Sequence, residues 1–191
     1  MVRWLLSGLR RAGFDYACFR IFAFSLDTTR KAPDPSIEGY RFTELLPADL
    51  EACPYTEVRD CDWYFGPGSC AFGVFRKDGA LACAQWLWFG DRYGQASFWP
   101  LAANEAASVQ LITAAPERGK GLATGLKNYS AQQMRQRGYS RLYSRIWWTN
   151  AASIRVSRKA GWKEVGMVLE VSAPFFSRPL RIVRRKADPR V

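Results

Sequence analysis

Residues 118–123 read Arg-Gly-Lys-Gly-Leu-Ala and stand between an apolar run, 109–115, and a segment with helical spacing. The two glycines, Gly119 and Gly121, therefore fall where a strand is expected to turn into a helix. Glycine tolerates positive φ values, and without a Cβ its backbone can come close to a bulky anion. The N-terminus of a helix also presents free N–H groups and a partial positive charge. The stretch predicts a loop that holds a phosphate group, with a plain structural turn as the alternative.

This loop matches neither of the two best-known nucleotide-binding loops. The G-x-x-x-x-G-K-[ST] spacing is absent. A dinucleotide fingerprint needs a third glycine where this chain has Thr124, or Gly125 out of phase. An anionic ligand of another kind is therefore expected.

A second motif follows further along the chain, where residues 150–153 read Asn-Ala-Ala-Ser and residues 159–162 read Lys-Ala-Gly-Trp. Together with the loop, this order resembles the GCN5-related N-acetyltransferase (GNAT) superfamily, whose cofactor loop reads R/Q-x-x-G-x-G/A. Arg118, Gly121 and Ala123 fill that pattern. The family's next signature is an asparagine, a small residue three positions on and a K-x-G-aromatic ending, which the second motif matches.

The resemblance extends over residues 37–173 and implies a single α/β (α+β) domain, with a central mixed, mostly antiparallel sheet flanked by helices. It also implies transfer of an acyl group from acetyl-CoA, or from a longer acyl-CoA, to a substrate amine. The pyrophosphate would lie on the loop amides, and the pantetheine arm would pair with the strand before the loop. The cofactor-binding residues expected on this basis are Ile112, Thr113, Arg118, Gly119, Lys120, Gly121, Leu122, Ala123, Asn150 and Ser153.

The catalytic groups depart from the family pattern, because many members place a tyrosine seven residues after the asparagine as the proton donor to the thiolate. This chain has Ser157 there. Ser157 shares a helix face with the asparagine and could point at the sulfur, and a serine that only packs the helix is the alternative. Tyr129 and Tyr143 are the other candidates for the acid. Glu105 is the nearest candidate for the base, with a solvated surface carboxylate as the alternative.

The composition excludes several kinds of active site. The chain has no histidine, which removes Ser/His/Asp triads, Cys/His dyads and histidine-based zinc sites. Its five cysteines are odd in number and lack any C-x-x-C spacing, which argues against a zinc ribbon or an extracellular disulfide scaffold. We therefore expect no metal and a cytoplasmic location.

The charge is strongly positive, because 28 Lys and Arg stand against 17 Asp and Glu and give a net charge of +11. Basic residues gather at both ends, and residues 2–10 have the pattern of a short basic amphipathic helix. This helix either docks on its own domain or lies on an anionic membrane surface, peripheral at the inner face. We divide the chain into an N-terminal extension, 1–36, and a GNAT-like domain with a basic C-terminal tail, 37–191.

Strands and helices alternate along the chain without internal repeats. A Lys-Asp-Gly turn at 77–79 predicts a hairpin, and Pro47 and Asn150 stand where helices are expected to begin. Residues 53–69 have no regular pattern. The strands expected are 19–26, 38–45, 70–76, 80–89, one around Ser97, one from Val109, 141–147, 165–173 and 180–184, and the main helices are 122–138 and 150–159.

The acceptor is the part of the function on which the sequence is least specific. Aromatic residues make up 15% of the chain, and we expect several of them to lie outside the core. With the basic ends, they indicate an N-acyltransferase that acts on a lipid-like or cell-envelope amine near a membrane. The alternatives are a protein or ribosomal-protein N-acetyltransferase, and an inactive GNAT-like module that binds anionic lipid or, less favoured, nucleic acid.

Overall fold

The computed structural model describes residues 15–26, 36–176 and 178–186. Its strands are β1 (Asp15–Ser25), β2 (Tyr40–Glu44), β3 (Ser69–Arg76), β4 (Leu81–Trp88), β5 (Glu105–Thr113), β6 (Arg141–Trp147), β7 (Lys163–Ser172) and β8 (Leu180–Arg185). They form one sheet in the order β2-β3-β4-β5-β6-β1-β7-β8. Neighbouring strands are antiparallel except β5 and β6, which are parallel. The predicted mixed, mostly antiparallel sheet is confirmed.

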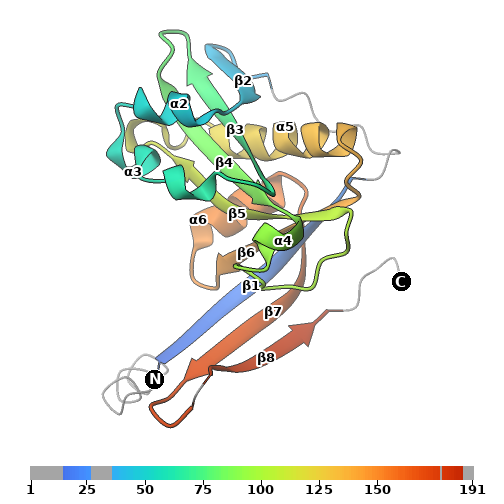
Figure 1. Cartoon of the computed structure of the whole chain (residues 1–191). Helices are drawn as coiled ribbons and strands as arrows, with labels where there is room; N and C mark the ends of the chain where they lie inside the picture. The colour runs from blue at the N-terminus through green and yellow to red at the C-terminus, as the bar shows by residue number, and fades with distance from the viewer. Residues whose placement is uncertain (1–14, 27–35, 177, 187–191) are drawn as a thin grey trace.

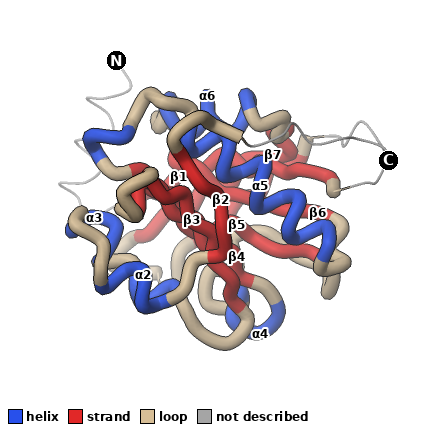
Figure 2. The backbone as a smooth tube through the Cα atoms, turned by 90° about the horizontal axis from the view of Figure 1, so that it is seen from above, coloured by secondary structure: helices blue, strands red, loops and turns tan. Residues whose placement is uncertain are grey.

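Helices cover both faces of the sheet (Figures 1 and 2). Helices α5 (Leu122–Gln136) and α6 (Ala151–Lys159) lie on one face, and the short helices α2 (Pro47–Glu51) and α3 (Thr56–Arg59) lie on the other. The apolar stripe of α5 is buried at Leu122, Leu126 and Met134 against β3 and β4. Gly138, with φ of 84°, follows the end of α5. The predicted helices at 122–138 and 150–159 are therefore confirmed.

Strand β1 lies inside the sheet, between β6 and β7 (Figure 1). It pairs antiparallel with β6 from Phe19 to Ser25 and with β7 from Asp15 to Ala23. Ile21 and Phe22 are fully buried. The strand predicted near the N-terminus is thus part of the same sheet as the rest, whereas the amphipathic pattern at residues 2–10 lies outside the described residues.

The segment before β5 differs from the prediction. No strand forms around Ser97, which has a φ of 32°; this part of the chain instead holds a short helix, α4 (Gly90–Tyr93), and turns. The Tyr93 hydroxyl donates to the Trp99 carbonyl at 2.6 Å and accepts from its N–H at 2.8 Å. The apolar residues that we assigned to a strand are therefore buried in a loop and hold it against the core. Strand β5 begins at Glu105, earlier than the predicted start at Val109.

The expectation that several aromatic residues lie outside the core holds only in part, because three of the six tryptophans that suggested it are buried, while Trp147 and Trp148 are half-buried. Trp86, Trp88 and Trp99 are buried, and the first two pack with Tyr64. Trp63 is exposed, with 57% of its surface accessible. Within the described residues, no helix is long and apolar enough to cross a membrane.

Candidate functional site

A gap opens in the sheet where β5 and β6 separate. The two strands pair only from Glu105 opposite Arg141 to Ser108 opposite Ser144, and both continue beyond that point. The pairing of β5 with β4 shifts by one residue at Val109, which leaves Val109 as a β-bulge. A bulge bends its strand and ends regular pairing. The bulge at Val109 therefore lies where β5 and β6 separate.

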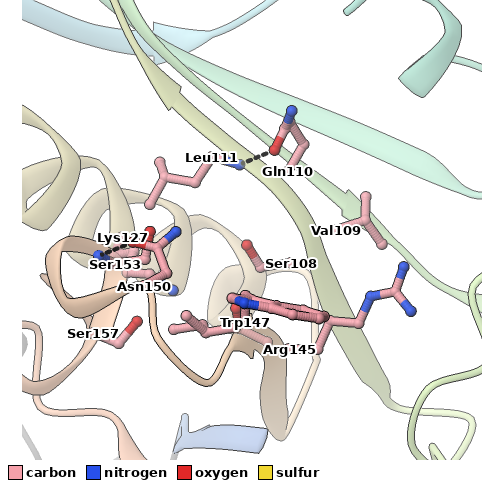
Figure 3. A pocket seen from close by; sticks show the side chains of 12 residues that line it. Ser108, Val109, Gln110, Leu111, Lys127, Arg145, Trp147, Asn150, Ser153 and Ser157 are labelled. Carbon is pink, nitrogen blue, oxygen red and sulfur yellow. Dashed lines mark hydrogen bonds between the residues drawn. The ribbon is translucent and has the colours of Figure 1, made fainter. Parts of the chain in front are cut away.

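The gap holds a cavity of about 170 Å³ between β5, β6, α5 and α6 (Figure 3). In Figure 3, Val109 and Arg145 point to one side of β5 and Leu111 points to the other, toward the helices. The cavity wall is rich in polar groups. Its polar residues on the helix side are Ser108, Lys127, Ser144, Asn150, Ser153 and Ser157.

The edge of β5 that faces the gap offers backbone groups to a ligand. The Leu111 N–H donates at 3.2 Å to the side-chain carbonyl oxygen of Gln110, its own neighbour (Figure 3). This N–H can donate equally well to the carbonyl oxygen of an extended ligand that lies beside the strand. The predicted cofactor residues Ile112 and Thr113 lie further along, at the end of β5, outside the cavity wall.

The glycine loop has the backbone conformation expected of an anion site. Gly119 and Gly121 have φ values of 83° and 82°, and Gly121 is the N-cap of α5. Within the described part of the chain, the N–H groups of residues 119–123 donate no hydrogen bond. Five adjacent donors at the start of one helix are suited to a phosphate.

The two basic side chains of the loop are held by neighbouring groups. Arg118 Nε donates to the Thr113 carbonyl at 3.1 Å, and Lys120 Nζ donates to Glu117 at 2.8 Å. Glu117 is only 3% exposed and also accepts from the Tyr40 hydroxyl at 2.6 Å. The hydrogen bonds from Lys120 and then Tyr40 hold the pKa of the Glu117 carboxyl below its usual value. Glu117 therefore acts as the anchor of the loop.

Replacing Glu117 with glutamine is expected to lower the melting temperature at neutral pH by a few degrees. Because the pKa of Glu117 is lowered in the folded state, the carboxylate stabilises the fold above the pKa it has in the unfolded chain. That contribution is lost as the pH falls through the folded value, so the two proteins should melt alike in acid. Thermal melts at several pH values test this, with the exposed Glu51→Gln as control. A deficit that persists unchanged in acid would contradict the assignment.

Helix α6 presents three predicted residues to the cavity. The Asn150 side chain caps the helix by accepting from the Ser153 N–H at 3.1 Å, as expected of an N-cap residue. Ser153 and Ser157 follow on the same face, and Ser157 directs its hydroxyl toward the hollow (Figure 3). Ser157 is fully buried, and its Oγ has no hydrogen-bond partner. A buried hydroxyl without a partner is uncommon and marks a place for a ligand or water.

The structure does not bring Glu105 to Ser157. Glu105 stands at the start of β5, where its carboxylate accepts from the Ala102 N–H at 2.9 Å and from the Tyr143 hydroxyl at 3.4 Å. Tyr143 and Tyr129 also lie outside the cavity wall, and Tyr129 packs against Phe42. Of the predicted catalytic residues, only Ser157 therefore reaches the cavity.

Lys127 is a cavity residue that we did not predict. It is 2% exposed, and its Nζ has no hydrogen-bond partner and lies 3.5 Å from the centre of the Trp162 ring. Burial lowers its pKa to about 7. The sequence held a signal, because Lys127 falls on the same helical stripe as Ala123 and Met134, where a charged residue is unusual.

A buried chain of hydrogen bonds supports the base of the cavity. Ser130 on α5 donates to the Gln85 side-chain oxygen at 2.9 Å, and the Gln85 side-chain nitrogen donates to Ser108 Oγ at 2.9 Å. All three side chains are buried. Because Ser108 Oγ accepts from Gln85, its own proton is free to be donated into the cavity.

Comparison with solved structures shows a shared fold. A GCN5-related N-acetyltransferase from Sphaerobacter thermophilus aligns with a TM-score of 0.58 and 16% identity, over 88% of this chain and 56% of that chain. A tandem GNAT protein from the clavulanic acid biosynthesis pathway aligns with a TM-score of 0.60 and 16% identity, over 90% and 58%. This chain thus spans little more than half the length of either. A putative GNAT acetyltransferase from Novosphingobium aromaticivorans aligns with a TM-score of 0.55 and 19% identity, over 92% and 69%.

Comparison by sequence identifies the family. No curated protein matches the chain. The model of the acetyltransferase (GNAT) domain family matches residues 40–163, which is more than half of the 191 residues. The chain therefore belongs to the GNAT family of acetyltransferases.

Proposed function

We propose that this protein transfers an acetyl group from acetyl-CoA to the amino group of a small acceptor. The family implies acetyl-CoA as the donor. The bound donor supplies an acyl group activated as a thioester. The work of the protein is then to hold the donor and to orient the amine beside it, and to receive or supply protons as the acyl group moves.

The observation that supports this proposal most strongly is the continuity between the glycine loop and the cavity. The free N–H groups of residues 119–123 suit a pyrophosphate, and α5 leads from them to the cavity between β5 and β6. Leu111 offers a donor to the pantetheine arm, and Asn150 and Ser153 form the opposite wall. An elongated donor with a phosphate end and an amide-rich arm fits this sequence of groups.

The dimensions of the site favour an acetyl group over a longer acyl chain. A cavity of about 170 Å³ is small for a ligand pocket. Of the aromatic side chains that suggested a hydrophobic acceptor, Trp86, Trp88 and Trp99 are buried in the core, whereas Trp147 lines the cavity. The buried tryptophans give no support to a lipid-like amine, and a small or peptide-borne amine is the simpler acceptor.

Calorimetric titration with acetyl-, octanoyl- and palmitoyl-CoA tests the proposal, with Gly121→Glu as the disrupting variant. A glutamate there introduces a negative charge and a Cβ at a residue with φ of 82°. The matched control is Gly79→Glu in the β3–β4 turn, because Gly79 has a φ of 87° and, like Gly121, open space around its missing Cβ. The control imposes the same backbone strain and charge away from the cavity.

We expect the wild type and Gly79→Glu to bind acetyl-CoA. Gly121→Glu should bind it at least about 100-fold more weakly, which corresponds to a loss of almost 3 kcal/mol of binding free energy. Preference for acetyl-CoA over palmitoyl-CoA would support the small acyl group. Absence of binding to all three donors would contradict the transferase proposal. Equal loss in both glycine variants would show that backbone strain, rather than the loop, is responsible.

A further inference from the structure

Lys127 and Ser157 are two unusual groups in the wall of the cavity. Both line it, both are buried, and neither Lys127 Nζ nor Ser157 Oγ has a hydrogen-bond partner. They come from different helices, α5 and α6, which pack against each other. Two unpaired polar groups in the wall of one cavity indicate a site that is completed by a ligand.

The environment of Lys127 contains no charge that would pair with it. The aromatic face of Trp162 covers its Nζ. The other polar groups of the cavity wall are the serine hydroxyls, the side-chain amides of Gln110 and Asn150, and the guanidinium of Arg145. Arg145 stays positively charged throughout the pH range and the other groups stay neutral, so the described wall offers no anion to pair with the Lys127 ammonium. Burial alone accounts for the lowered pKa of Lys127, which is about 7. At neutral pH the amine is therefore present in both its charged and its neutral form.

We infer that Lys127 is the proton donor to the sulfur of the departing coenzyme A, in the role that a tyrosine fills in many relatives of this chain. The inference rests on the proposed function. The serine that stands at the tyrosine's position is too weak an acid for this task, since an alkyl hydroxyl does not ionise in the protein range. Lys127 lines the same cavity, and with its pKa lowered by burial to about 7 its ammonium is a stronger acid than a thiol, whose ordinary pKa is about 8.5.

The proton balance of the step is simple. As the acceptor nitrogen forms its bond to the acyl carbon, the carbon–sulfur bond breaks and its electron pair goes to sulfur. The ammonium form of Lys127 gives one proton to that sulfur and becomes a neutral amine. The acceptor nitrogen releases its surplus proton to water, and Lys127 regains a proton from solvent. Loss of the proton removes a charge from a buried position, so burial favours this step.

The ionisation of the bound coenzyme A thiol tests the inference without an acceptor. An opposite charge beside a thiol lowers its pKa by about 1 to 3 units, and donation by Lys127 requires a shift near 1 unit, because a larger one means that the ammonium keeps its proton beside the thiolate. The ultraviolet absorbance of the thiolate should therefore rise at lower pH in the complex with wild-type protein than in the complex with Lys127→Met. The complex with desulfo-coenzyme A gives the background. Lys77→Met, in the exposed β3–β4 turn, is the control substitution and should behave as the wild type.

Each outcome separates this inference from the proposed function. If coenzyme A binds both proteins and the thiol ionises about 1 pH unit lower in the wild type, Lys127 lies beside the sulfur and can still give it a proton, as inferred. A shift of about 2 units or more would mean that ammonium and thiolate persist as an ion pair, and it would overturn the donation. If coenzyme A binds both and the thiol ionises alike, the proton donor is another group and only the inference fails. If it binds neither, the proposed function fails and the inference with it. Loss of binding only in Lys127→Met would assign Lys127 to donor binding and would overturn its role as an acid.

Discussion

Lys127→Met is expected to raise the free energy of unfolding by about 3 kcal/mol at pH 6. A fall in the lysine pKa from 10.5 to about 7 corresponds to on the order of 5 kcal/mol of destabilisation, at 1.36 kcal/mol per pKa unit. The Trp162 ring beside the Nζ offsets up to about 2 kcal/mol of this for the charged form. Methionine has a similar volume and no charge, so it fills the site without the desolvation cost.

The gain in stability should depend on pH in a defined direction. The folded-state pKa of Lys127 is lowered, so between pH 7 and 10.5 the unfolded chain binds a proton that the folded chain does not. The stability of the wild type therefore rises with pH across this range. The advantage of Lys127→Met is largest below pH 7 and disappears toward pH 10.5. Urea unfolding at pH 6, 8 and 10 measures it.

The exposed Lys77→Met is again the matched control and should change stability little at any pH. A Lys127→Met protein less stable than the wild type at pH 6, or a gain that does not change with pH, would show that Lys127 is not a desolvated amine. The expected gain also answers a practical concern. If Lys127→Met is more stable than the wild type, a difference between the two proteins in the ionisation of the bound thiol cannot result from unfolding of the variant.

The regular part of the fold could be predicted because local signals agree with the tertiary structure. The Lys-Asp-Gly turn predicts the β3–β4 hairpin, and Asn150 predicts the start of α6, which its side chain caps. The helical spacing from Leu122 and the glycine that follows the helix, Gly138, predict α5 with both its ends. In each case the decisive residues lie within a few positions of the structure that they specify.

The segment before β5 could not be predicted, because its conformation depends on distant contacts. Tyr93 fixes the loop by two hydrogen bonds to Trp99, and Arg181 of the edge strand β8 donates to the carbonyls of Ser97 and Phe98. The apolar residues of this loop are buried under tertiary packing, which a period-two pattern cannot reveal.

The candidate site was predicted where it depends on backbone and missed where it depends on burial. The positive φ values at Gly119 and Gly121 and the cap at Asn150 follow from residue type. Glu105 lies away from the cavity because β5 and β6 diverge only beyond Ser108. Among the described residues, Lys127 has no partner for its Nζ because of where α5 and α6 pack together. Sequence spacing does not contain that information.

Gln85→Leu is expected to lower the free energy of unfolding by about 2 to 3 kcal/mol, because it breaks the buried chain between α5 and β5. Ser108 Oγ loses its donor, and Ser130 loses one of its two acceptors and keeps the Lys127 carbonyl at 3.1 Å. The larger part of the cost comes from leaving Ser108 Oγ without its partner rather than from the bonds themselves. Urea unfolding at neutral pH measures the loss.

The triple variant Ser108→Ala, Gln85→Leu, Ser130→Ala distinguishes these two sources. Removing all partners together leaves no buried polar atom of the chain unpaired, so the triple variant should recover much of the stability lost in Gln85→Leu alone. Losses that simply add would show that packing, not hydrogen bonding, sets the cost.

Because Gln85 also fixes Ser108 with its proton free toward the cavity, Gln85→Leu should weaken the binding of acetyl-CoA in calorimetry while the remote Gly79→Glu does not. If the buried hydrogen bonds of Gln85 were only structural, Gln85→Leu would lower the stability and leave the affinity for acetyl-CoA unaltered.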